Sequence, residues 1–128
     1  MDNISNYVCV LNQAIKTNKT TLFIPYNRIN FLISSLLYRE NLIYLYQINY
    51  STNKIKISLN KLDNQFIFSR ICRVSKPSKR VYFKSEDVKR KVIKEGRFFI
   101  LSTNKGIITS NEAIKKNVFG EVLMEIFF

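Results

Sequence analysis

The chain has 128 residues, 46% of them hydrophobic and 23% charged, which is a globular composition and a length for one domain or two very small ones. It contains no His, and Cys9 and Cys72 have no metal-binding spacing, so the usual general base and the common metal sites are excluded. With 21 Lys and Arg against 9 Asp and Glu, the net charge of +12 favours a polyanionic partner such as nucleic acid, an anionic membrane or an acidic protein.

The positive charge is concentrated in one part of the sequence. Residues 70–116 contain 14 Lys and Arg and 4 Asp and Glu, whereas the rest of the chain carries a net charge of only +2. We therefore expect the polyanion to face this segment, although a solvated surface without a partner has the same pattern. The apolar runs are too short to cross a membrane.

The first half of the chain alternates helical and strand patterns. In chain order, the spacing of apolar residues and the capping residues predict a helix over 3–16, a strand over 20–24, a helix from the Asn27 cap to about Arg39, a hairpin of strands 42–50 and 55–59, and a strand over 66–74. Asn41 stands where a left-handed residue ends a helix. The two cysteines are expected to be small core residues.

The second half is rich in strands and in turn residues. In chain order we predict a loop at 75–79, a strand at 81–83, a helix capped by Ser85 and ending near Gly96, strands at 98–101 and 107–108 around the loop 102–106, a short helix capped by Thr109, and a strand over 122–128. The prediction is an α+β fold of two small packed domains: an N-terminal αβαββ-like domain, residues 1–72, and a strand-rich C-terminal domain with short helices, residues 73–128.

The loop from Ser102 to Gly106 is a candidate binding element. Its two hydroxyls and the Asn104 amide can hydrogen-bond base edges and ribose 2′-hydroxyls, Lys105 can neutralise a phosphate, and Gly106 permits close approach of a backbone. The same residue types are also typical of an ordinary hairpin turn.

A second candidate element surrounds Pro77. The stretch from Arg73 to Tyr82 combines cations with small hydroxyls, a pattern that suits a phosphate backbone. Tyr82 could stack on a base or sugar, although a single Tyr on a strand is more often a core residue.

Catalytic patterns are weak. Without His, a Ser nucleophile would need a Lys partner, and no motif supports such a dyad. The adjacent Glu86 and Asp87 suit the start of a helix, and no glycine-rich phosphate-binding loop is present. We predict no catalytic residue, metal or cofactor.

Several motifs in one register resemble the bacterial-type small-subunit ribosomal protein S8 family. The resemblance is carried by Arg73-Val74-Ser75-Lys76-Pro77 with Arg80-Val81-Tyr82, by Ile100-Leu101-Ser102-Thr103 with Gly106-Ile107-Ile108, by Gly120-Glu121-Val122-Leu123, and more loosely by Asn18-Lys19, Pro25 with Arg28, and Arg39 to Ile43. It covers nearly the whole chain.

The resemblance implies a structural protein of the small ribosomal subunit that binds a stem in the central domain of the small-subunit rRNA and assists assembly. It implies RNA contacts by Ser75, Lys76, Pro77, Lys79, Arg80, Tyr82, Ser102, Thr103, Asn104, Lys105, Gly106 and Glu121, and secondary contacts by Lys19 and Arg28. The hydroxyl loop would enter the minor groove, Ser75, Lys76, Arg80 and Lys105 would hold phosphates, and Glu121 would orient its neighbours.

The expected partners are this rRNA and neighbouring small-subunit ribosomal proteins, with no membrane, no small-molecule substrate and no homo-oligomer. Half of the residues are Ile, Asn, Lys, Phe, Tyr or Met, as in AT-rich genomes, and the N-terminus lacks a signal or transit pattern. We therefore predict a mitochondrial ribosome, with a plastid-type organelle or an AT-rich bacterium as alternatives. A free RNA-binding regulator using the same surface, or a small hydrolase, would be the alternative functions.

Overall fold

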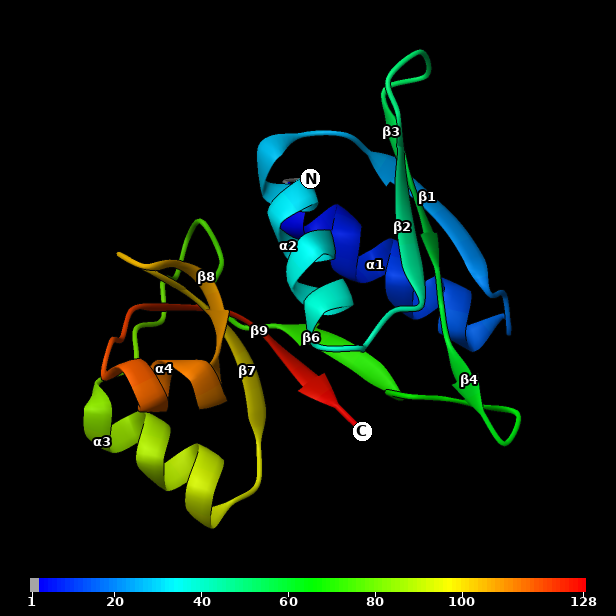
Figure 1. Cartoon of the computed structure of the whole chain (residues 1–128). Coiled ribbons are helices and arrows are strands. Elements are labelled where there is room, and N and C mark those ends of the chain that lie inside the picture. Colours follow the sequence, from blue (N-terminus) through cyan, green and yellow to red (C-terminus); the bar gives the residue numbers. More distant parts are fainter. Residues whose placement is uncertain (1–2) are drawn as a thin grey trace. The chain divides into compact units, whose positions relative to one another are not determined.

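The computed structural model describes residues 3–128, which form two compact units. The N-terminal unit runs to Arg70 and includes Phe128, and the C-terminal unit is Ile71–Phe127. Helices and antiparallel strands occur in both units (Figure 1), which confirms the predicted α+β class.

The N-terminal unit begins with two helices separated by a strand and continues with antiparallel strands. Its elements are α1 (Asn3–Lys16), β1 (Thr21–Pro25), α2 (Arg28–Arg39), β2 (Leu45–Asn49), β3 (Lys54–Ser58), β4 (Lys61–Leu62) and β5 (Gln65–Phe66). The Asn27 side chain caps α2 by accepting a hydrogen bond of 2.9 Å from the Asn30 amide. Asn41 has a φ of 60°, so it takes the left-handed conformation expected after the helix.

The three longer strands of this unit form a sheet in the order β1-β3-β2, with helices beside it (Figure 1). Because side chains alternate along a strand, Leu22 and Ile24 of β1 and Ile55 and Ile57 of β3 are buried together. The intervening residues of all three strands, β1, β2 and β3, lie on the opposite, exposed face.

Two predictions in the first half were wrong. The expected strand over 66–74 is two separate pieces: Phe66 ends β5 of the small β4–β5 hairpin, and Arg70–Arg73 form β6. Asp63 and Asn64, with left-handed φ angles of 53° and 64°, form the tight turn of that hairpin. Cys9 is exposed, since it lies beside the buried stripe of α1 rather than within it. Cys72 is half-buried.

The C-terminal unit contains a four-stranded sheet in the order β6-β9-β7-β8. Besides β6, its elements are α3 (Ser85–Val88), the π-helical segment η1 (Lys89–Lys94), β7 (Phe98–Thr103), β8 (Gly106–Thr109), α4 (Ser110–Lys116) and β9 (Glu121–Phe127). Thr109 caps α4 as predicted, its hydroxyl accepting from the Glu112 amide at 3.2 Å. Ser85, in contrast, is the first residue of its helix, and Lys84 is the cap.

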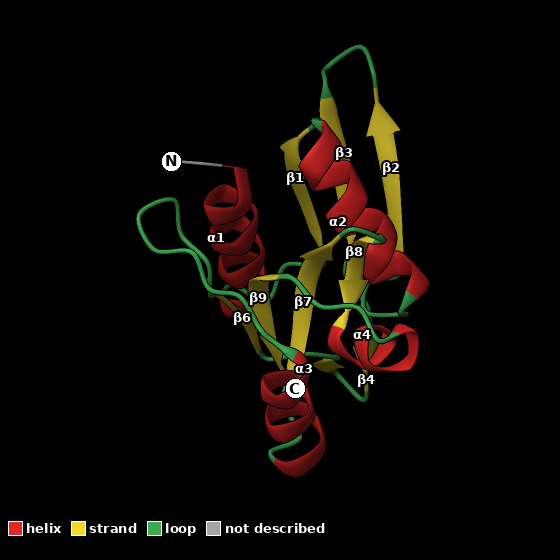
Figure 2. Ribbon diagram, turned by 90° about the vertical axis from the view of Figure 1, so that its left-hand side faces the viewer, coloured by secondary structure: helices red, strands yellow, loops and turns green. Residues whose placement is uncertain are grey.

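Helices cover one face of this sheet (Figure 2). The core on that face contains Phe83, Val88, Phe99, Leu101 and Val122. The pairing of β7 with β9 shifts between Ile100 and Leu101, where a bulge inserts one extra residue in β9. At the end of the sheet beyond the bulge, Ser102 and Glu121 pair on the face away from these helices.

Candidate nucleic-acid interface

The beginning of β9 brings together the two segments singled out in the sequence. Ser102 of β7 pairs with Glu121 on one side, and Tyr82 forms a bridge with Glu121 on the other. The Val122 amide donates to the Val81 carbonyl at 2.9 Å, and the Phe83 amide donates to the Gly120 carbonyl at 3.0 Å. Tyr82, Glu121 and Ser102 therefore form one cross-strand row, although Tyr82 and Ser102 are twenty residues apart in sequence.

The hairpin between β7 and β8 is tight and internally bonded. The Thr103 hydroxyl accepts from the Lys105 amide at 3.1 Å and donates to the Gly106 carbonyl at 3.0 Å. Gly106 has a φ of 98° with open space where a Cβ would stand, so the backbone conformation is what favours glycine there. Thr103 and Gly106 thus shape the turn and present its tip.

The tip of this hairpin carries polar groups that the fold leaves available. Within the part of the chain that the structure describes, no hydrogen bond or ion pair involves the side chain of Ser102, Asn104 or Lys105. Asn104 and Lys105 are exposed, and Ser102 is half-buried. An exposed amide and an exposed ammonium therefore lie at the tip, and a half-buried hydroxyl without a partner lies just before it in β7.

The Pro77 turn is a second tight turn. The amides of Lys76 and Lys79 each donate to the other residue's carbonyl, at 2.9 and 3.0 Å, so the two residues between them are forced to the outside. Lys76 and Lys79 are exposed, and over residues 3–128 neither ammonium has a hydrogen-bond or ion-pair partner. Both cations are available to phosphates.

Ser75 does not share that exposure. It is 2% exposed, and its hydroxyl accepts from the Val81 amide at 2.9 Å and donates to the Val81 carbonyl at 3.1 Å. The structure therefore places Ser75 at the closure of the loop rather than on its surface. The role it supports is the positioning of Arg80 and Tyr82.

Arg80 and Glu121 form an ion pair at the centre of the row. The Arg80 guanidinium donates to the Glu121 carboxylate at 3.0 Å, and the Arg80 side chain keeps half of its surface exposed. A guanidinium has five N–H donors, so Arg80 retains donors for a phosphate while Glu121 holds its orientation. Tyr82 is 64% exposed beside this pair, which makes it a surface ring rather than a core residue.

Gly120 is a residue of this site that the list of predicted contacts omitted. A Cβ added at Gly120 would collide with the carbonyl oxygen of Ser102. The absence of a side chain there allows the chain entering β9 to lie against the end of β7. The Gly-Glu pair was visible in the sequence, but the reason for the glycine depends on a contact between segments far apart.

Other cations of the basic segment are neutralised within the fold. Arg97 bonds Glu125 through two N–H groups at 2.8 and 2.9 Å, and Glu125 is 5% exposed. These hydrogen bonds raise the pKa of Arg97 above its ordinary value, outweighing the opposing effect of burial. Arg90 pairs with Asp87, and Lys116 with Glu112. The net charge of the segment therefore overstates the number of cations free to bind a polyanion.

Lys19 and Arg28, the predicted secondary contacts, belong to the N-terminal unit. Lys19 follows α1 and Arg28 begins α2, and both are exposed. Among residues 3–128, no group of three or more His, Cys, Asp or Glu side chains could hold a metal ion. The same residues include no helix with the length and hydrophobicity to span a membrane.

Comparison with known proteins gives matches over nearly the whole chain. The family described as ribosomal protein S8 matches residues 2–127. The small ribosomal subunit protein uS8 of Chlorobaculum tepidum is 38% identical, covering 98% of this chain and 97% of its own. Proteins named small ribosomal subunit protein uS8c from Bigelowiella natans and Helicosporidium sp. are 33% and 35% identical, over 98% and 99% of this chain and 98% and 97% of their own.

Proposed function

The chain belongs to the ribosomal protein S8 family and is a structural constituent of the small ribosomal subunit; from this premise we propose that it binds a stem in the central domain of the small-subunit rRNA through the C-terminal unit. The contact surface is the row of Tyr82, Glu121 and Ser102 together with the two tight turns beside it. We call this surface the β9 row.

The observation that carries this proposal is the conjunction of unpaired donors and unpaired cations in one row. Ser102 and Asn104 have free polar side chains, and Lys76, Lys79 and Lys105 have free ammonium groups. The backbone that carries them is held by hydrogen bonds within the two turns. This backbone is therefore preorganised, so less backbone entropy is lost when RNA binds.

The chemistry of these groups fits an irregular RNA stem. The major groove of an RNA helix is too narrow for side chains, whereas its shallow minor groove exposes 2′-hydroxyls and base edges. The short side chains of Ser102 and Asn104 suit that groove. Lys76, Lys79, Lys105 and the free donors of Arg80 hold the flanking phosphates, and Tyr82 lines the same surface. Thr103, Ser75 and Gly106 support the turns.

A substitution at Ser102 tests whether its hydroxyl recognises the cognate stem or whether binding depends only on general contacts that any RNA duplex offers. We expect Ser102→Ala to weaken binding of the cognate stem about two- to tenfold, the usual net effect of one lost hydrogen bond, because the hydroxyl has no role inside the fold. Binding is measured by titrating labelled stem RNA with the full chain at constant salt. A regular RNA duplex of the same length is the reference, and its affinity should stay within about twofold.

Asn111→Ala is the matched control, since Asn111 is an exposed polar residue of α4, outside the β9 row. It should leave both affinities unchanged. An equal loss on the cognate stem and the regular duplex for Ser102→Ala contradicts readout by this hydroxyl.

The ribosomal role predicts that the chain co-sediments with small subunits. A protein that acts only as a free regulator of messenger RNA would instead stay in the supernatant after ribosomes are pelleted from the native cell. Membership of a ribosomal protein family also supports our proposal that the chain is not an enzyme.

The compartment is a proposal of its own. The amino-acid composition is typical of AT-rich genomes and supports an organelle-encoded ribosomal protein, with a mitochondrion as the first expectation and a plastid-type organelle as the second. The two uS8c relatives, chloroplast forms by name, support the plastid-type alternative. Sequencing the rRNA that co-purifies with the tagged chain tests it, because mitochondrial, plastid and bacterial rRNA differ in sequence.

A further inference from the structure

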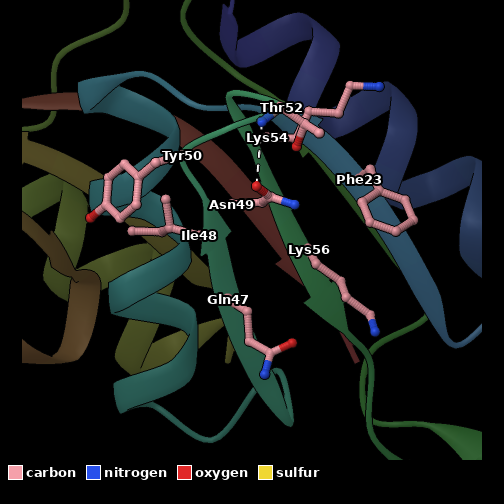
Figure 3. A pocket seen from close by; sticks show the side chains of 8 residues that line it. All are labelled: Phe23, Gln47, Ile48, Asn49, Tyr50, Thr52, Lys54 and Lys56. Atoms are coloured by element: carbon pink, nitrogen blue, oxygen red, sulfur yellow. Dashed lines mark hydrogen bonds between the residues drawn. The ribbon is translucent and has the colours of Figure 1, made fainter.

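The exposed face of the N-terminal sheet carries an aromatic and basic row. In the register of the three strands, Phe23 of β1 lies opposite Lys56 of β3, which lies opposite Gln47 of β2. The next row toward the β2–β3 turn contains Lys54 opposite Asn49. Side chains that share such rows project from the same face of the sheet. Figure 3 shows Phe23, Lys56, Gln47 and Asn49 around a shallow hollow of about 410 Å³.

Phe23 is displayed on the solvent face rather than packed into the core. It is 56% exposed, and its sequence neighbours Leu22 and Ile24 are 5% and 1% exposed on the opposite face. The fold therefore gains little from a phenyl ring at this position. An exposed ring bordered by strands is a flat apolar surface on which a planar group can stack.

The lysines of this face are unengaged. Over residues 3–128, neither Lys54 nor Lys56 has a hydrogen-bond or ion-pair partner. Lys61, in the next strand β4, shows the contrast: its ammonium donates to Asn18 at 2.6 Å and lies 4.8 Å from the centre of the Phe66 ring. The strands β1, β2 and β3 contain no Asp or Glu, so the field over this face is positive.

The side-chain amides of Asn49 and Gln47 add hydrogen-bonding groups to this face. The Asn49 side-chain oxygen accepts hydrogen bonds from the β2–β3 turn: one from the Ser51 hydroxyl at 2.6 Å, and one from the Thr52 amide at 3.3 Å, which Figure 3 shows as a dashed line. This arrangement fixes the side chain, and over residues 3–128 its NH₂ group has no hydrogen-bond acceptor. Gln47 forms no side-chain hydrogen bond over the same residues. The face thus combines a stacking surface, two cations and amide groups.

We propose that this face is a second RNA-binding site, separate from the β9 row, which takes an unpaired nucleotide of single-stranded RNA. The base stacks on Phe23, the phosphates on either side of it bind Lys56 and Lys54, and Gln47 and Asn49 hydrogen-bond the base edge. A protein partner fits less well, because Phe23 and Leu45, the large apolar side chains exposed on this face, lie on β1 and β2 with β3 between them and do not form the contiguous apolar patch on which a protein interface centres. The site does not depend on the function proposed above.

The test uses the full chain and a decauridylate RNA, which forms no duplex and carries a photoreactive 4-thiouridine. Crosslinked peptides should contain residues of β1 and β3. In anisotropy titrations, Phe23→Ala should weaken binding at least about fivefold, since stacking contributes about 1–3 kcal/mol per base. Phe23→Tyr, which keeps an aromatic face, should stay within about twofold of the parent. Lys56→Gln should reduce the salt slope of log K by about 0.7, one phosphate of a single strand.

Matched controls lie in the same unit. Tyr44→Ala removes a ring that is 65% exposed and Lys16→Gln removes an exposed lysine, both outside this face, and neither should change decauridylate binding. Thermal melting confirms that each variant is folded. Crosslinks confined to the C-terminal unit, or an unchanged affinity for Phe23→Ala, overturn the proposal. If Phe23→Leu binds as well as the parent, the contact is not stacking and the site does not recognise a base.

Cognate-stem binding provides an independent readout. Phe23→Ala should leave the affinity for the isolated stem unchanged, and Ser102→Ala should leave decauridylate binding unchanged. Failure of the sheet site is therefore distinguishable from failure of the β9 row. Phe23→Ala and Lys56→Gln could also keep their affinity for RNA but no longer co-sediment with small subunits. This result would indicate that the face binds a protein, and it would contradict the proposal.

Discussion

Individual polar residues in the core of the N-terminal unit are satisfied by specific partners. Tyr7 and Ser34 are both fully buried, and their hydroxyls lie 3.0 Å apart, joining α1 to α2. Burial raises the pKa of Tyr7 above its ordinary value, an effect that the Ser34 hydrogen bond only partly offsets. The folded state therefore requires a neutral phenol at this position.

This burial predicts a loss of stability in alkali. Because the folded-state pKa of Tyr7 exceeds the unfolded value of about 10, its stability contribution is complete below pH ~10 and falls as the pH rises above it. Tyr7→Phe removes that titration, so its free energy of unfolding should fall less steeply above pH ~10 than that of the parent. Ser34→Ala, which leaves the phenol in place, should keep the parent's alkaline slope. Urea denaturation across pH 8–11 measures all three.

At the scale of elements, the close approach of β9 to β7 decides the shape of the β9 row. Gly120 precedes β9, and its missing side chain leaves room for the Ser102 carbonyl. The Gly120 carbonyl also accepts from Phe83, so the same point anchors the segment that leads from the Pro77 turn. Both turns are thus positioned by contacts of one glycine.

We therefore expect Gly120→Ala to weaken stem binding as well as stability. The added methyl group must displace backbone at Ser102, and a displaced row loses several RNA contacts at once, so affinity should fall more than tenfold. Gly96→Ala is the control, because Gly96 has a φ of 68° but open space around its Cβ position. It should lower the melting temperature through backbone strain while stem affinity stays within about twofold. Equal affinities for both variants would show that the Gly120 contact does not shape the site.

For the molecule as a whole, the free cations matter more than the net charge. Several arginines of the basic segment are held in ion pairs, including Arg97 with the nearly buried Glu125. In contrast, Lys76, Lys79 and Lys105 remain free beside the β9 row. Because salt screens charges beyond about 8–10 Å, distant lysines contribute little to a particular RNA contact at physiological ionic strength.

A salt titration distinguishes local contacts from the overall charge. Lys105→Gln should lower the slope of log K against log salt for the cognate stem by about one, as expected for one lost phosphate contact. Lys115→Gln removes the same charge from the exposed surface of α4, which packs on the other face of the sheet from Ser102, and should leave the slope unchanged. Equal decreases for the two variants would mean that net charge alone governs binding.

Most elements of the fold could be predicted from local patterns. The helix over residues 3–16, the Asn27 and Thr109 caps and the left-handed Asn41 all depend on a few neighbouring residues, and the structure agrees with each. Prediction failed over 66–74, where apolar residues were interpreted as one strand. Phe66 instead ends a short hairpin that turns at Asp63 and Asn64, and residues 67–69 separate this hairpin from β6.

The amino-acid sequence alone determined the α+β class, the order of most elements and the S8 family, because capping, periodicity and motif spacing are properties of neighbouring residues. Only the tertiary structure decided which polar groups are available. The Ser75 hydroxyl is hydrogen-bonded within its own loop, Arg80 is oriented by Glu121, and the Phe23 ring is exposed on the outer face of its sheet. Each outcome depends on strand register and on contacts between residues distant in sequence, which side-chain chemistry by itself does not specify.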